Sequence, residues 1–221
     1  MFDLLPEQVR QNAVQFLVND IKSRRNHIST GFLGTSYLCH VLSENGFTDT
    51  AYDLLLQETY PSWLYPVKMG ATTIWERWDG QKTDSTFQDP GMNSFNHYAY
   101  GAIGDWMYRV SAGIEIKSPG YKHIVIQPHP SKRLNYSKAS FESSYGTITS
   151  GWERKDGKII VKIRVPANTR ATVILPVIQA AKVTENGKAI SGNADFSDIR
   201  TADNKLLFEA GSGEYTFEFT E

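Results

Sequence analysis

The sequence has a single cysteine, Cys39, among its 221 residues. One cysteine cannot form a disulfide within one chain, so a disulfide framework is excluded and the redox compartment stays open. Cys39 lies in an apolar helical pattern beside Leu38 and Val41, where a buried, unreactive thiol is expected.

Long apolar runs and an excess of one charge are also lacking. No stretch of about 18 apolar residues occurs, and the first residues lack the basic region and apolar run of a signal peptide. We therefore expect a soluble protein with no membrane partner, whose cellular location the sequence leaves open. The 23 basic and 24 acidic residues give a net charge of -1, which offers no bulk positive surface to a phosphate backbone. Nucleic acid is therefore not expected as a partner.

Aromatic residues, by contrast, are plentiful, and the segment from Gly70 to Gly80 places Glu76 between Trp75 and Trp78. Indole faces stack on the C–H face of a sugar ring, and a carboxylate beside them can take a proton from water. This combination is typical of glycoside chemistry. The alternative is that Glu76 pairs with a cation while the indoles fill a core, and spacing alone favours that alternative.

The first half of the chain has helical periodicity. Apolar residues recur at helical spacing from Pro6 to Lys22, from Leu33 to Leu42, and after Thr48, which is expected to cap a third helix. Periodicity is lost over residues 58–93, which predicts a long irregular segment carrying the residue 70–80 motif.

A fourth helix is expected after this segment, with Ser94 as its cap and His97 in its first turn. A neutral imidazole there could hold a sugar hydroxyl. The alternative is a histidine whose nitrogens are satisfied by the local backbone.

The second half of the chain has the two-residue periodicity of β-strands. Apolar and polar residues alternate over residues 159–165 and 215–220, and Asp156-Gly157 and Asn186-Gly187 are strong hairpin signals. These patterns predict many short antiparallel strands in a β-sandwich. The change of period near Ser118 predicts two domains, residues 1–118 and residues 119–221.

Four motifs in the first half resemble, in the same order, the C-terminal part of bacterial α-L-rhamnosidases of glycoside hydrolase family 78. They are Ser29-Thr30-Gly31-Phe32-Leu33-Gly34-Thr35, Glu58-Thr59-Tyr60-Pro61-Ser62-Trp63, Gly70-Ala71-Thr72-Thr73-Ile74-Trp75-Glu76-Arg77-Trp78 and Ser94-Phe95-Asn96-His97-Tyr98-Ala99-Tyr100-Gly101. The resemblance implies a partial (α/α)6 toroid of paired helices followed by a β-sandwich. It also implies a hydrolase that releases terminal α-L-rhamnose with inversion and needs neither a cofactor nor a metal.

The resemblance assigns roles residue by residue. Glu76 matches the general base that activates water, and His97 matches a histidine that contacts rhamnose. Trp78 and Trp63 are weaker candidates for aromatic residues that face the sugar. A rhamnose-containing glycoside or polysaccharide is the implied substrate.

The general acid of the family lies upstream of the region that the chain resembles. We therefore expect a fragment of a longer enzyme that is inactive by itself, because general-acid catalysis supplies about 10²- to 10⁴-fold in rate. Asp79, Asp84 or Asp89 could instead supply the acid from the same loop. The alternative from another class is a non-catalytic carbohydrate-binding or interaction protein, whose incomplete helical shell would expose apolar stripes and favour self-association.

Overall fold

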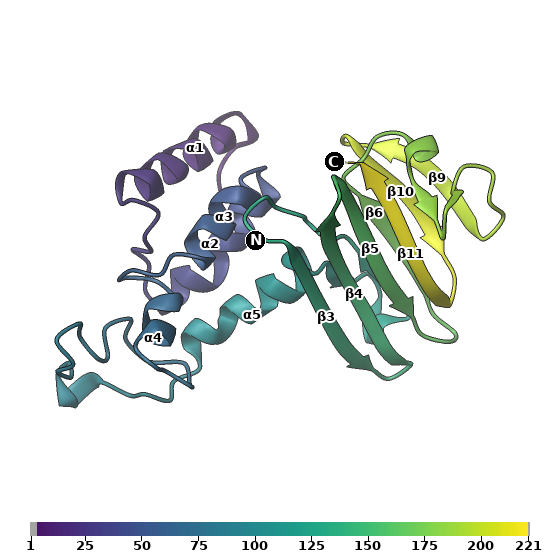
Figure 1. Cartoon of the computed structure of the whole chain (residues 1–221). Helices are drawn as coiled ribbons and strands as arrows, with labels where there is room; N and C mark the ends of the chain where they lie inside the picture. The colour runs from purple at the N-terminus through teal and green to yellow at the C-terminus, as the bar shows by residue number, and fades with distance from the viewer. Residues whose placement is uncertain (1–3, 221) are drawn as a thin grey trace. The chain divides into compact units, whose positions relative to one another are not determined.

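The structure, a computed structural model, describes residues 4–220 and forms two compact units, which divide between Trp106 and Met107. The first unit is helical and the second is built of strands (Figure 1). The predicted order, part of a helical toroid followed by a β-sandwich, is confirmed. The boundary between residues 118 and 119 stays a prediction.

The helices of the first unit bury apolar residues at helical spacing, and some other apolar residues on these helices stay exposed. The helices are α1 (Glu7–Ser23), α2 (Phe32–Glu44), α3 (Thr48–Leu55), α4 (Leu64–Lys68) and α5 (Ile103–Trp106). Helix α1 buries Val14, Val18 and Ile21, and α2 buries Leu38 and Leu42, at the spacing that brings side chains to one side of a helix. Within residues 4–220, no helix is both long enough and apolar enough to cross a membrane.

Trp106 ties α5 to two earlier helices. Its indole Nε1 donates to Ser43 Oγ in α2 at 3.0 Å, and its ring meets the ring of Tyr52 in α3 edge-on, with centroids 5.0 Å apart. Cys39 in α2 is buried, as predicted, and burial raises the pKa of its thiol to about 12. The helices of this unit therefore pack around a common apolar interior.

Two details of the helical prediction are wrong. Thr48 is the first residue of α3, and Phe47 occupies the cap position without a side-chain capping bond. The region of residues 58–93 is largely irregular, but it contains α4 and the 3₁₀ turn η1 (Pro90–Met92), drawn in blue to teal in Figure 1.

The predicted fourth helix also starts later than expected. Helical turns begin with η2 (Ala99–Ala102), so His97 precedes them and Ser94 does not cap them. The backbone N–H of His97 donates to Ile74 O at 2.8 Å, a bond to another segment of the chain. This tertiary bond takes the place of the helical one that the local pattern predicted.

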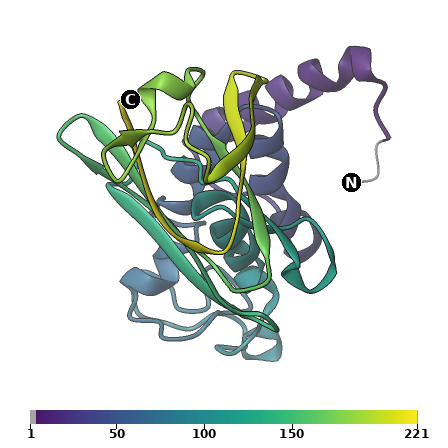
Figure 2. The ribbon, with the colours of Figure 1, turned by 90° about the vertical axis from the view of Figure 1, so that its right-hand side faces the viewer.

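The second unit is a β-sandwich of two sheets, seen from a second direction in Figure 2. The five-stranded sheet has the order β1-β2-β6-β10-β9, with β1 (Ile114–Ile116), β2 (His123–Ile126), β6 (Arg170–Leu175), β10 (Lys205–Ala210) and β9 (Phe196–Ala202). The six-stranded sheet has the order β3-β4-β5-β11-β7-β8, with β3 (Tyr136–Ser143), β4 (Gly146–Lys155), β5 (Lys158–Val165), β11 (Gly213–Thr220), β7 (Thr184–Glu185) and β8 (Lys188–Ala189).

The strand pairs are antiparallel except for one. Strands β2 and β6 pair in parallel, with His123 opposite Arg170, in a sandwich that is antiparallel, as predicted, at the other strand pairs of residues 4–220. The two predicted hairpins are present, and Asp156-Gly157 and Asn186-Gly187 have the positive φ angles that tight two-residue turns require.

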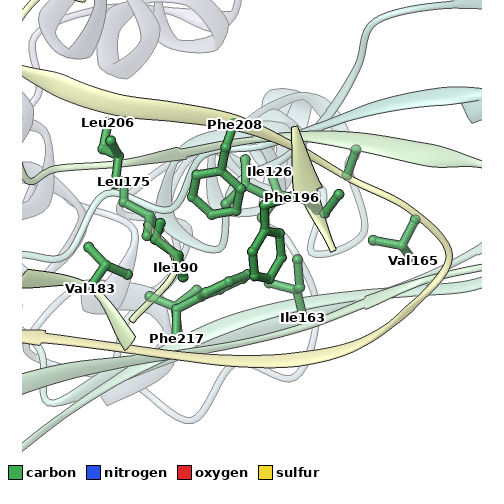
Figure 3. Packing of buried hydrophobic residues seen from close by; sticks show 14 of the residues in the cluster. Ile126, Ile163, Val165, Leu175, Val183, Ile190, Phe196, Leu206, Phe208 and Phe217 are labelled. Carbon is green, nitrogen blue, oxygen red and sulfur yellow. The ribbon is translucent and has the colours of Figure 1, made fainter. Parts of the chain in front are cut away.

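The core of the sandwich lies between the two sheets. Phe208 from the five-stranded sheet and Phe217 from the six-stranded sheet point toward each other, with ring centroids 5.2 Å apart (Figure 3). Phe196 packs edge-on against Phe208 at 5.3 Å. Alternation along each strand puts these apolar residues inside and leaves the intervening polar residues on the outer faces.

Candidate active site

Two segments of the helical unit lie side by side and carry the predicted catalytic and sugar-binding residues. Glu76 N donates to Ser94 O at 2.8 Å, and His97 N donates to Ile74 O at 2.8 Å. Glu76 and His97 are 21 positions apart in the sequence but lie on segments joined by backbone hydrogen bonds. The structure therefore brings these two residues into one local framework.

The carboxylate of Glu76 is half-buried and is fixed by the backbone. Its Oε2 accepts a hydrogen bond from Ser94 N at 2.8 Å. The neighbouring cation is engaged elsewhere, because Arg77 Nε lies 3.5 Å from Asp79 Oδ1. Among the described residues no ion pair involves Glu76, so the expected alternative of a pairing with Arg77 is not what the chain adopts. One oxygen is thus anchored, and the charge is not neutralised by a neighbouring cation.

The imidazole of His97 stacks with two aromatic rings. Phe32, at the start of α2, lies nearly parallel to it at 4.8 Å, and Tyr98 lies on it at 5.3 Å. His97 Nδ1 accepts a weak hydrogen bond from Ala99 N at 3.3 Å. In the neutral ring this acceptor role leaves the proton on Nε2, which can donate to a ligand oxygen.

Trp75 is a buried residue of the helical unit. Its ring is 6% exposed and meets Phe95 edge-on at 5.0 Å. Gly80 closes the motif against both rings, because a Cβ there would lie 3.2 Å from Trp75 Cε3 and 3.2 Å from Phe95 Cε1. The core role that the alternative interpretation gave to the indoles therefore applies to Trp75.

Trp78 and Trp63 have different environments. Trp78 is half-buried and stacks on Tyr100 at 3.7 Å, with an angle of 18° between the rings. Trp63 is 7% exposed, donates from Nε1 to Tyr100 O at 2.9 Å and meets Trp78 edge-on at 5.6 Å. Trp63 thus supports the ring of Trp78, and its own indole N–H is already satisfied. Sugar contact by either tryptophan stays a prediction.

The three aspartates of the same loop accept hydrogen bonds from residues of that loop. Asp79 Oδ2 accepts from Gln88 Nε2 at 2.5 Å, and Asp89 Oδ1 accepts from Gly91 N at 2.8 Å. Hydrogen bonds from the side chain and backbone of Thr86 hold the pKa of Asp84 below its usual value. A general acid must be protonated near neutral pH, so the environment of Asp84 opposes that role.

Metal-ligating residues do not cluster in the described part of the chain. Among residues 4–220, no group of three or more His, Cys, Asp or Glu side chains could hold a metal ion.

Sequence reasoning missed the partners that position the site residues. Ser94 was expected to cap a helix, whereas its amide holds Glu76. Tyr100 and Tyr98 stand in the same motif as His97, so their aromatic character could have marked them. Phe32 could not have been assigned to His97, because no periodic pattern links residues so far apart in the chain.

Family models match both units. The model described as the bacterial alpha-L-rhamnosidase 6 hairpin glycosidase domain matches residues 1–110. The model described as the bacterial alpha-L-rhamnosidase C-terminal domain matches residues 113–189.

Known proteins match almost the whole chain. A solved structure of Streptomyces avermitilis α-L-rhamnosidase complexed with L-rhamnose is 41% identical, with a TM-score of 0.90 over 99% of this chain and 20% of that one. The α-L-rhamnosidase structure from Dictyoglumus thermophilum is 34% identical, with a TM-score of 0.86 over 99% of this chain and 24% of that one. An α-L-rhamnosidase of Formosa agariphila is 41% identical over 98% of this chain and 23% of its own length. The chain therefore spans roughly a fifth to a quarter of the length of the proteins that it resembles.

Proposed function

The chain belongs to the bacterial α-L-rhamnosidase family, and we propose that it contributes the general base and part of the sugar site to an enzyme that releases terminal α-L-rhamnose. The observation that carries this proposal is the environment of Glu76. Its carboxylate is half-buried, anchored at Oε2 by Ser94 N and paired with no cation within the described residues. A carboxylate held in this way can accept a proton at its other oxygen.

In the proposed reaction, hydrolysis inverts the anomeric carbon. Glu76 takes a proton from a water molecule while the water oxygen bonds to C1 of the rhamnosyl group. The bond from C1 to the leaving oxygen breaks at the same time, and a general acid protonates that oxygen. The anchor from Ser94 N fixes the carboxylate, so no reorientation is needed as the proton moves.

His97 and Trp78 orient the sugar in this proposal. His97 Nε2 donates to a rhamnose hydroxyl, because Nδ1 already accepts from Ala99 N. The Phe32 and Tyr98 rings restrict rotation of the imidazole. Trp78, one face of which lies on Tyr100, presents apolar surface to the C–H face of the ring. Trp63 acts through Trp78 rather than on the sugar.

We place the general acid outside these 221 residues. An inverting pair needs its two carboxyl groups about 6.5–9.5 Å apart, with the acid protonated. Asp79, Asp84 and Asp89 each accept hydrogen bonds within their own loop, and those from Thr86 hold the pKa of Asp84 below its usual value. The greater length of the related enzymes supports a position for the acid elsewhere in the catalytic domain. The 221-residue chain by itself is then expected to turn over rhamnosides at least about 10²-fold more slowly than the whole enzyme.

Glu76→Gln in the whole enzyme tests the proposed base. Glutamine keeps the shape of the side chain and an oxygen that can accept from Ser94 N, but it cannot take the proton. We expect kcat on an aryl α-L-rhamnoside to fall by about 10²- to 10⁴-fold with little change in KM.

Glu58→Gln is the matched control, because Glu58 is exposed and pairs with Lys68 in the same unit. Its kcat should match that of the parent enzyme. A Glu76→Gln enzyme that retains the parent kcat would reject the base assignment. Observation of the first product by NMR checks the stereochemistry: α-rhamnose formed first would reject inversion.

A second candidate is a carbohydrate-binding or interaction protein without catalysis. It is favoured by exposed apolar side chains on the helices, such as Phe16 in α1, which is 77% exposed, and Leu33 in α2, which is 87% exposed. Such surface recruits a partner or a second copy. Sedimentation of the chain reports self-association, and calorimetry with L-rhamnose reports binding. Binding by the whole protein without any turnover would favour this candidate over the enzyme.

A further inference from the structure

A hollow of about 360 Å³ opens on the β-sandwich unit at the start of the parallel pair of strands. It is lined by Ser118, Lys122, His123, Asn168, Thr169 and Arg170. The lining contains two cations and no carboxylate, in a protein whose net charge is -1. This hollow therefore concentrates positive charge at one place on the unit.

A directed chain of hydrogen bonds leads away from the hollow. Arg170 Nε donates to His123 Nδ1 at 3.2 Å, and an arginine can only donate. In the neutral imidazole the proton is then on Nε2, which lies 2.8 Å from Thr172 Oγ1. Thr172 in turn donates to Glu209 Oε1 at 2.5 Å. Arg170 thus fixes the tautomer of His123, and the carboxylate of Glu209, which can only accept, fixes the donation by Thr172, whose Oγ1 also accepts from Lys117 Nζ at 2.9 Å.

The strand registers place these four residues beside one another. His123 is opposite Arg170 in the parallel pair β2 and β6, and Thr172 is opposite Glu209 in the antiparallel pair β6 and β10. Burial and the nearby charges of Lys117 and Arg170 lower the pKa of His123, against the opposing effect of Glu209. The imidazole therefore stays a neutral acceptor for the arginine at neutral pH.

The side chain of Arg170 is therefore held through its Nε atom. The Nε atom of Arg170 is engaged by His123, and within the described residues no hydrogen bond engages its two terminal nitrogens. These nitrogens form a planar fork that matches two oxygens of a carboxylate, sulfate or phosphate. Lys122 adds a second positive charge at the same hollow, where its ammonium group lies 4.9 Å from the ring centre of Tyr145.

We propose that this hollow binds an oxyanion, with Arg170 as the bidentate ligand and Lys122 as the second cation. His123 is a positioning residue, since it orients the guanidinium without reaching the anion. The volume of about 360 Å³ exceeds that of a single small anion, so the group can be part of a larger molecule such as a sugar acid or a sulfated sugar. The site is independent of Glu76 and of rhamnoside hydrolysis.

Amide NMR titrations of the 221-residue chain test the proposal at constant ionic strength, with chloride replaced in turn by sulfate, phosphate and D-glucuronate. We expect saturable shifts at the amides of His123, Asn168 and Arg170 with at least one of these anions. Glucuronate binding as tight as sulfate binding would identify a carboxylate-bearing sugar as the ligand, and sulfate or phosphate binding alone would identify a tetrahedral oxyanion.

Arg170→Gln should weaken binding about tenfold or more, and Arg170→Lys should weaken it less because the charge remains while the fork is lost. Arg200→Gln is the matched control, because Arg200 is an exposed arginine of β9 that pairs with Asp198. It should leave the affinity unchanged, and the spectra themselves report whether each variant is folded. Shifts that do not saturate, equal shifts with neutral L-rhamnose, or equal affinity in Arg170→Gln would each overturn the proposal.

Discussion

Replacement of Trp63 by phenylalanine tests whether this residue supports the site from within or faces the sugar. The structure places Trp63 at 7% exposure, with its indole N–H donated to Tyr100 O at 2.9 Å. Phenylalanine keeps a flat ring that can still meet Trp78 edge-on, but it has no donor. The substitution therefore removes one hydrogen bond and part of a buried ring.

The expected loss of stability has two parts. Tyr100 O also accepts from the backbone N–H of Ile103, so the carbonyl keeps one donor, and the loss of the indole hydrogen bond costs about 0.5–1.5 kcal/mol. The smaller ring leaves a cavity and loses buried apolar area, which costs about 1 kcal/mol more. Trp63→Phe should therefore lower the free energy of unfolding of the helical unit by about 1.5–2.5 kcal/mol.

Urea denaturation followed by circular dichroism at 222 nm measures this loss, because that signal reports the helices. Trp78→Phe is the matched control: Trp78 is half-buried, its stacking on Tyr100 survives in phenylalanine, and its N–H has no partner among the described residues. The control should change the free energy by less than about 1 kcal/mol. A Trp63→Phe variant as stable as the control would refute the supporting role and leave Trp63 available to a sugar.

Two further predictions concern buried ionisable groups. Burial and then the charge of Lys205 lower the pKa of His129 from 6.5 to about 4, so the unfolded chain binds a proton first and stability falls as the pH drops from about 6.5 to about 4. Because the ring is partly exposed, the free energy of unfolding should fall by about 1–3 kcal/mol over this range. Urea titrations at several pH values measure the fall, and His129→Gln should remove this part of the pH dependence. Cys39 is 2% exposed with a pKa raised to about 12, so it should resist a thiol reagent at pH 8 in the folded chain and react once in denaturant. Rapid reaction of the folded chain would contradict its burial.

The β-sandwich could be predicted from the sequence because its signals are local. Alternation over residues 159–165 and the turn at Asp156-Gly157 fix a strand, its inner face and its hairpin partner. The parallel pairing of β2 with β6 could not be read in this way, since alternation gives the face of a strand and not the direction of its neighbour. The turn at Asp203-Asn204, where both residues have positive φ, was not among the two predicted hairpins, because it lacks the glycine that marks those two.

The start of the fourth helix shows where local patterns fail. The spacing of apolar residues after Ser94 fits a helix, and a hydroxyl residue fits its cap. In the structure the N–H of His97 bonds to Ile74 O, and the first helical turn begins only at Ala99. A hydrogen bond from a segment distant in sequence outweighs the local preference, and no property of residues 94–97 alone could reveal it.

In the candidate site, too, some features could be predicted from the sequence and others could not. The neighbours Trp75 and Trp78 drew attention to Glu76, and the family resemblance supplied the predicted role as a base. The hydrogen bond that holds its carboxylate could not be predicted, because Ser94 N reaches Oε2 only when two irregular segments pair. Sequence could therefore nominate candidate site residues, whose roles stay predictions, whereas the groups that hold them depend on tertiary contacts.

The two carboxylates of the residue 70–80 motif have different partners. Asp79 takes both the cation Arg77 and the amide of Gln88. Glu76, three positions earlier, receives only a backbone N–H, which orients a carboxylate without adding a full positive charge beside it. A base that must gain a proton would be weakened by a neighbouring guanidinium, because that charge stabilises the ionised form. The pairing of Arg77 with Asp79 therefore leaves Glu76 as the carboxylate of this motif that is suited to accept a proton.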